Sequence, residues 1–153
     1  MFRVEAQKDN SFHFVRDTMT ITGTDKVLEG EYMEVVLRDQ HVVRLYKADD
    51  RKVYVRFIVA KNFYFDKVAT LEILSGSKTY PIKNAHQWKV NKTRGLFVSE
   101  IFTNYLSTLQ AEGMTALLFN QTLTKFSRLD TKKIKRMSSA FREAYLAEEK
   151  KTK

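Results

Sequence analysis

The chain has 153 residues and no cysteine, and its formal net charge is +9. This length is that of one ordinary domain, and 43% of the residues are hydrophobic, which is sufficient for a single packed core. The missing cysteines exclude disulfides and thiolate metal sites. The first residues carry charges that a secretory signal lacks, and no apolar run approaches the roughly 18 residues of a membrane span. These features predict a cytoplasmic protein that neither spans nor crosses a membrane.

The positive charge is concentrated toward the carboxyl end. Residues 125–153 contain ten Lys or Arg and four Asp or Glu, a net +6, which leaves +3 of the total +9 for the first 124 residues. A basic patch of this kind attracts polyanions such as nucleic acid, and it also arises on a solvated helix face. The residues that would contact nucleic acid are Lys132, Lys135, Arg136 and Arg142.

Alternating apolar and polar residues predict strands in the first half of the chain. Residues 2–6 and 12–16 favour two short strands, and residues 17–30 favour a loop with a short strand at 19–21. Residues 34–37 and 41–46 flank a polar turn, which predicts a hairpin. In residues 53–59 the odd positions are all apolar and should face the core; they are Val53, Val55, Phe57 and Val59.

The β pattern continues with strands at 68–74 and 79–90, and the second contains the only proline, Pro81, which marks an edge, an end or a bulge. Ser99 is a favourable helix cap, so a helix is predicted from residue 99 to residue 112, ended by Gly113. Residues 114–119 are almost entirely apolar, which indicates a strand buried on both faces. Strand, helix and strand in this order predict a right-handed crossover.

The last predicted helix covers residues 131–148, with Asp130 as its cap. Its apolar face, which should dock on the sheet, consists of Ile134, Met137, Phe141, Ala144 and Tyr145. Residues 149–153 should form a frayed, charged tail. The sequence therefore predicts one α+β domain over residues 1–148, with a mixed, mostly antiparallel sheet, a β-α-β crossover and a carboxyl-terminal basic helix.

The chain contains no sequence motif typical of a metal site or of a catalytic nucleophile. The three histidines are isolated and no HExxH pair is present, so no metal site is predicted. The G-x-S-x-G, Walker and dinucleotide-binding glycine patterns are also missing. The one remaining feature is residues 91–99, where a strand is predicted to pass through a basic turn into a helix. The unpaired amides of that helix start, with Lys92 and Arg94 nearby, would suit a pyrophosphate.

The order of a β meander, a long strand, the Thr93-Arg94-Gly95 turn, an amphipathic helix, Gly113 and a buried strand resembles the GNAT acyltransferase superfamily. In that family the turn carries Arg/Gln-x-x-Gly-x-Gly/Ala, whose amides bind the pyrophosphate of acetyl-coenzyme A. The resemblance implies acetyl-CoA as the cofactor, with Arg94 at the first motif position, Phe97 at the first motif glycine and Ser99 at the second. The residues that it assigns to cofactor binding are Lys92, Arg94, Gly95, Leu96, Phe97, Val98 and Ser99.

A second likeness lies downstream of the predicted buried strand. Asn120-Gln121-Thr122 and Ser127-Arg128-Leu129 resemble positions near the acceptor end of the groove in small GNAT-like proteins of tailed bacteriophages. The resemblance covers roughly residues 53–129 and implies an N-acyltransferase with an unknown acyl acceptor. After residue 129 a basic helix stands where the family commonly adds two strands.

Acyl transfer of this kind needs a base that deprotonates the amine and a donor that returns a proton to the leaving thiolate. Glu72 and His86, on strands that precede the turn, are the candidate bases, and Tyr145 in the last helix is the candidate donor. Each residue also has a purely structural interpretation. Glu72 fits a solvent-facing strand position, His86 a hydrogen-bonded strand histidine, and Tyr145 the apolar face of its helix.

Three functions therefore stay open. The first is an acyl-CoA-dependent N-acyltransferase. The second is a GNAT-like phage structural or host-interaction protein without a cofactor, suggested by the bulk of Phe97, whose partner is a host or virion protein and whose location is the host cytoplasm or the virion. The third is a basic protein that contacts duplex nucleic acid nonspecifically through its last helix, since no aromatic residues interleave the basic ones there.

Overall fold

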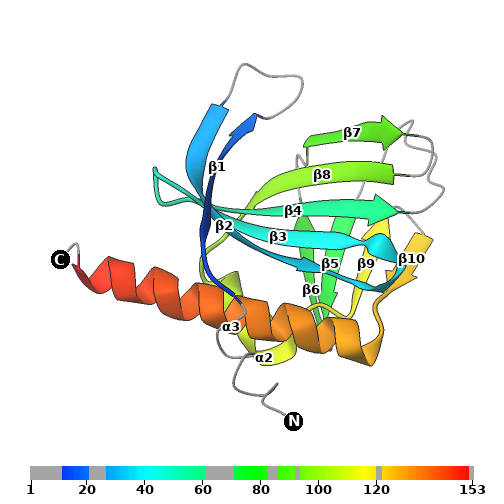
Figure 1. Ribbon diagram of the computed structural model, residues 1–153. Helices are drawn as coiled ribbons and strands as arrows, with labels where there is room; N and C mark the ends of the chain where they lie inside the picture. The colour runs from blue at the N-terminus through cyan, green and yellow to red at the C-terminus, as the bar shows by residue number, and fades with distance from the viewer. Residues whose placement is uncertain are drawn as a thin grey trace, which may run out of the picture.

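The computed structural model describes residues 12–20, 27–60, 71–82, 86–91, 94–119 and 122–151. Within them the chain forms two antiparallel sheets and two α-helices, which confirms an α+β, mostly antiparallel fold (Figure 1). The strands are β1 (Val15–Thr20), β2 (Val27–Val36), β3 (Val42–Ala48), β4 (Val53–Ala60), β5 (Leu71–Ser75), β6 (Lys78–Ile82), β7 (His86–Asn91), β8 (Arg94–Ile101), β9 (Ala116–Phe119) and β10 (Thr122–Lys125). The helical elements are the 3-10 turn η1 (Arg38–Gln40), α2 (Tyr105–Glu112) and α3 (Arg128–Lys151). The strand predicted at 2–6 lies outside the described residues.

The larger sheet has six strands in the order β1-β2-β3-β4-β8-β7, and neighbouring strands in it are antiparallel. β2 and β3 form the predicted hairpin, with η1 in its turn. Val53, Val55, Phe57 and Val59 of β4 are at most 1% exposed, so the predicted core face of this strand is confirmed. In Figure 1, β1 and the first part of β2 turn away from the other four strands, which gives the sheet a strong curl.

The smaller sheet has four strands in the order β10-β9-β5-β6, also antiparallel. Pro81 lies in β6 at the edge of this sheet, as expected for a residue without an amide hydrogen. The single strand predicted over 79–90 is in fact two strands in different sheets, because β6 belongs to the smaller sheet and β7 to the larger one.

Helix α2 connects the two sheets. β8 precedes it in the larger sheet and β9 follows it in the smaller one. The predicted β-α-β crossover is therefore wrong, because a crossover joins two parallel strands of the same sheet. Gly113 ends α2 as predicted, with a φ of 68° and its N–H donated to the carbonyl of Leu109 at 2.8 Å.

The main hydrophobic core contains residues from both sheets and both helices. The rings of Phe97 on β8 and Phe119 on β9 join the two sheets, with centroids 4.8 Å apart. Helix α3 supplies Ile134, Met137 and Phe141, all fully buried. A second buried cluster lies on the opposite face of the larger sheet and consists of Met19, Leu28, Tyr46, Ala48, Tyr54, Leu96 and Val98.

Helix α3 begins three residues before the predicted start and ends three residues after the predicted end. The hydroxyl of Ser127 accepts a hydrogen bond from the amide of Asp130 at 3.1 Å, so Ser127 is the capping residue instead of Asp130. The helix also includes residues 149–151, which were predicted to fray, and Glu149 contacts Arg51 there at 2.9 Å. Figure 1 shows α3 as the long orange and red helix that runs along one side of both sheets.

Candidate functional site

Residues 94–99 of the predicted pyrophosphate segment lie in an inner strand of the larger sheet. Residues 94–99 belong to β8, which pairs with β4 on one side and with β7 on the other. A strand paired on both sides commits its amides to the ladders, so the row of unpaired amides expected at a helix start is not formed here. Helix α2 begins only at Tyr105, so the predicted start at Ser99 is wrong, whereas the predicted end at Glu112 is confirmed. Lys92 lies outside the described residues.

The side chains of this segment explain why it forms a strand. Residues 95–99 are five consecutive buried residues, as expected of a strand covered on both faces. Phe97 packs in the core against Phe119, and Leu96 and Val98 belong to the buried cluster on the other face. The hydroxyl of Ser99 donates to the carbonyl of Glu100 at 3.1 Å and caps no helix. Burial on both faces therefore overrides the local capping signal.

The three candidate catalytic residues lie in three different elements. Glu72 is half-buried in β5, opposite Pro81 and Leu118. His86 is the first residue of β7, in register with Val98. Tyr145 lies in the last third of α3, and its hydroxyl donates to the carbonyl of Arg51 at 3.2 Å. Among the described residues no hydrogen bond or ion pair joins Glu72 to Tyr145, and their catalytic roles stay predictions.

Tyr145 borders a polar hollow of about 250 Å³ between the end of α3 and the β3–β4 turn. Burial, reinforced by the charge of Glu149, raises the pKa of its phenol. The charged residues around the hollow are paired with one another, as in the contacts of Arg51 with Glu149 and of Lys47 with Glu31 at 3.4 Å. Lys47 also contacts Glu148, and Arg16 is bonded to Asp49. These contacts fasten the end of α3 to the sheet, and we assign no catalytic role to them.

The exposed side of α3 carries the other predicted site. At 3.6 residues per turn, the buried residues of this helix lie on one side, and the opposite side of its first half is basic. Five cationic side chains there are exposed, and we refer to them together as the basic face: Arg128, Lys132, Lys133, Lys135 and Arg136. Three of them were predicted from the sequence, whereas Arg128 and Lys133 were missed. Counting helical positions outward from the buried Ile134 and Met137 would have identified both.

The parts of the chain that the structure describes do not neutralise the charges of the basic face. Within the described parts of the chain, none of the seven ion pairs involves a residue of this face. The nearest acid in the helix, Asp130, is buried and accepts a hydrogen bond from the amide of Arg38. The second half of α3 differs, because there Glu148 and Glu149 contact Lys47 and Arg51. Positive charge is therefore concentrated on the first half of the helix.

Arg142, the fourth predicted nucleic-acid contact, does not belong to the basic face. Its guanidinium is half-buried and donates to the side-chain oxygen of Gln110 in α2 at 2.7 Å. The amide nitrogen of the same Gln110 donates to the hydroxyl of Ser139. Arg142 therefore acts in the contact between the two helices.

Polar contacts hold the first turns of α3 in place. Ser127 caps the helix, the carboxylate of Asp130 accepts from the amide of Arg38, and the hydroxyl of Thr131 donates to the carbonyl of Met114 at 2.9 Å. The basic face is thus presented on a helix whose position is defined by two other parts of the chain.

No helix in the described part of the chain is both long and apolar enough to cross a membrane. Across the same residues, no three His, Asp or Glu side chains gather in an arrangement that could hold a metal ion. Comparisons with protein-family models, curated proteins and solved structures return no match for this chain.

Proposed function

We propose that the protein binds the phosphate backbone of duplex nucleic acid through the basic face of α3. The observation that carries this proposal is the set of five exposed cations without an acidic partner among the described residues. Contacts of Lys and Arg with phosphates release condensed counterions and supply most of the affinity of nonspecific nucleic-acid binding. Side chains that were neutralised by neighbouring carboxylates could not make this contribution.

The dimensions of the basic face suit a duplex. From Arg128 to Arg136 the helix advances about 12 Å at 1.5 Å per residue. That length is similar to the width of the major groove, about 12 Å, so the two ends of the face can reach phosphates on both sides of a groove. The aromatic residues of the helix favour a duplex over a single strand. Phe141 is buried on the opposite side, and Tyr145 is bonded to the β3–β4 turn, so neither is placed to stack on bases.

A salt titration of binding to a duplex of random sequence tests the proposal. If all five cations contact phosphates, the logarithm of the binding constant should fall with the logarithm of salt concentration with a slope of about −4.5. The double variant Lys132→Glu/Arg136→Glu should weaken binding at least tenfold and reduce the slope by about 2. The matched control is Lys150→Glu/Lys151→Glu, which changes the net charge equally on exposed residues of the same helix. Equal losses in both variants would show that net charge, and not the basic face, governs binding.

The acyltransferase hypothesis and the hypothesis of a GNAT-like protein that has lost its cofactor remain predictions. Neither gains support from residues 94–99, because their amides lie in a sheet ladder. A thermal melt with acetyl-CoA tests the first directly, since a ligand at about 100 times its dissociation constant adds about 2.7 kcal/mol of stability. An upward shift of the melting temperature would restore the acyltransferase hypothesis, and an unchanged melt would remove it.

A further inference from the structure

Two arginines face each other on the side of the larger sheet that is turned away from the main core. Arg44 of β3 and Arg56 of β4 are direct cross-strand partners. The same row continues to Glu34 on one side and to Val98 on the other. Like charges directly opposite each other destabilise a sheet. The pair therefore requires a compensating interaction.

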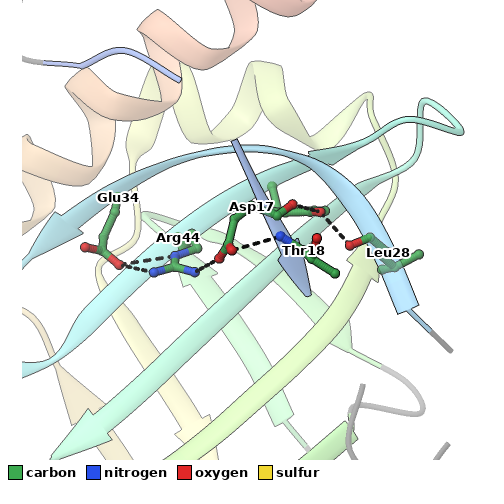
Figure 2. A network of polar contacts seen from close by, with 6 residues as sticks. Asp17, Thr18, Leu28, Glu34 and Arg44 are labelled. Atoms are coloured by element: carbon green, nitrogen blue, oxygen red, sulfur yellow. Dashed lines mark hydrogen bonds and ion pairs between the residues drawn. The ribbon is translucent and has the colours of Figure 1, made fainter. Parts of the chain in front are cut away.

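Arg44 has that compensation within the protein. Its Nε and Nη2 atoms donate to Oε1 of Glu34 at 3.1 and 2.8 Å, and its Nη1 lies 3.6 Å from Oδ2 of Asp17 (Figure 2). Its guanidinium also stacks over the ring of Tyr32, with 3.6 Å between Cζ and the ring centroid. Asp17 in turn accepts the amide of Thr18 at 2.8 Å. Both neighbouring carboxylates are therefore already engaged.

Arg56 has no such partner. It is partly buried, and in the described part of the chain it makes no hydrogen bond or ion pair. Burial first, and the charge of Arg44 second, lower the pKa of its guanidinium, although an arginine keeps its proton in any case. The protein therefore holds a charged group with five N–H donors in a place that disfavours the charge. Such a cost is expected where a residue serves a ligand and not stability.

We propose that Arg56 binds an oxyanion, either a carboxylate or a phosphoryl group, on this face of the larger sheet. A planar guanidinium donates two parallel hydrogen bonds to either group, and the added negative charge would offset the repulsion between Arg56 and Arg44. Apart from Arg44, the described side chains beside Arg56 on this face of the sheet are apolar or aromatic. Ile58 and Tyr54 flank it along β4, and Val98 lies opposite it on β8. The site is separate from the basic face, because α3 packs on the core side of this sheet.

Thermal melts of the wild type and of Arg56→Met in chloride, phosphate and acetate at equal ionic strength test this inference. In chloride the variant should melt at a higher temperature than the wild type, because the unpaired charge is removed. Phosphate or acetate should then raise the melting temperature of the wild type more than that of the variant, and the apparent dissociation constant should rise roughly tenfold or more in the variant. The test compares the rise in melting temperature that each anion causes in the wild type and in Arg56→Met. This comparison is needed because phosphate stabilises many proteins by being excluded from their surface. The anion with the larger difference identifies the ligand class.

The matched control is Lys78→Met, which removes an exposed cation of β6 outside the basic face and should retain the full anion effect. A variant that melts below the wild type in chloride would show that Arg56 is a structural residue and would overturn the proposal. Equal anion effects in the wild type and in Arg56→Met would overturn it as well.

Discussion

Arg38 and Asp130, 92 positions apart in the chain, are joined by a hydrogen bond from the backbone amide of Arg38 to Oδ1 of Asp130 at 3.2 Å. Asp130 is only 3% exposed, and this part-buried bond links the first turn of α3 to the turn between β2 and β3. It fixes the position at which the basic face begins.

Removal of this carboxylate should destabilise the fold. In Asp130→Ala the amide of Arg38 loses its acceptor, which should cost about 1–3 kcal/mol of unfolding free energy. Asp130→Asn keeps an oxygen in place and should lose less. Urea unfolding measures both variants, with Glu143→Ala, an exposed residue of the same helix, as a control that should stay within about 0.5 kcal/mol of the wild type. Equal effects of the alanine and asparagine variants would contradict the role of the hydrogen bond.

Gly113 should not tolerate a side chain. Its φ of 68° and ψ of −150° lie in a region that is essentially confined to glycine, and a Cβ there would come within 2.7 Å of the backbone carbonyl of Thr131. Gly113→Ala should therefore lose about 2 kcal/mol or more in urea unfolding. Gly76 is the matched comparison, because its φ is 64° but the nearest atom is the end of the flexible Glu112 side chain. Gly76→Ala should lose only about 1 kcal/mol, and the reverse order would refute the argument.

Tyr46 should make the protein sensitive to alkali. Burial first, and the charge of Asp17 second, raise the pKa of Tyr46 to about 12, and its hydroxyl lies 2.9 Å from the carbonyl of Leu28. The pKa of Tyr46 in the native protein is higher than the value of about 10 in the unfolded chain. The contribution of this phenol to the free energy of unfolding is therefore complete below pH 10 and is lost as the pH rises through 12. Unfolding free energies measured between pH 9 and pH 12 should show this decline. In Tyr46→Phe the decline should be shallower, although this variant starts from lower stability because a hydrogen bond is missing.

Lys47 should contribute to the attachment of α3 through its ion pairs. Its side chain is almost buried, contacts Glu31 and Glu148, and lies 4.6 Å from the ring centroid of Phe14. Lys47→Met keeps the apolar stem but leaves both carboxylates without their cation. Because these carboxylates are partly exposed, the expected loss is about 1–2 kcal/mol, below that of a fully buried pair. A double-mutant cycle with Glu148→Gln should give a coupling of at least about 0.5 kcal/mol, whereas additive losses would exclude a direct interaction.

The fold class and the β2–β3–β4 part of the larger sheet could be predicted from the sequence, because period-two alternation is typical of a strand with one face in the core. In β4, Val53 to Val59 show this pattern without interruption, and the structure buries all of the odd positions. The hairpin between β2 and β3 followed equally from its polar turn. The assignment of β6 and β7 to different sheets did not follow, because strand pairing depends on residues far away in the chain.

The segment from 94 to 101 shows why the predicted helix start at Ser99 was wrong. Ile101, Tyr105 and Leu109 recur at a spacing of four and are all buried, which suggested one helix. Ile101, however, ends β8, and only the later two lie in α2. The spacing extended across an element boundary by coincidence. The apolar stretch from Leu96 to Val98, with its high β propensity, was the signal for a strand.

In the candidate sites, too, features that depend on local periodicity could be predicted, and features that depend on distant partners could not. The exposure of Lys132, Lys135 and Arg136 could be predicted because helical periodicity is local. The half-buried position of Arg142 could not, because its partner, Gln110, comes from another helix. The pairing of Arg44 with Arg56 requires the register of β3 and β4, which alternation alone does not define.

The place of α3 in the chain also has a consequence for biosynthesis. This helix follows every strand of both sheets, yet it supplies Ile134, Met137 and Phe141 to the shared core. A ribosome therefore completes the strands before it delivers the helix that covers them. The growing chain exposes an apolar surface during that interval, which is the condition in which nascent proteins aggregate or engage chaperones. The shared core should accordingly form only after α3 has been synthesised.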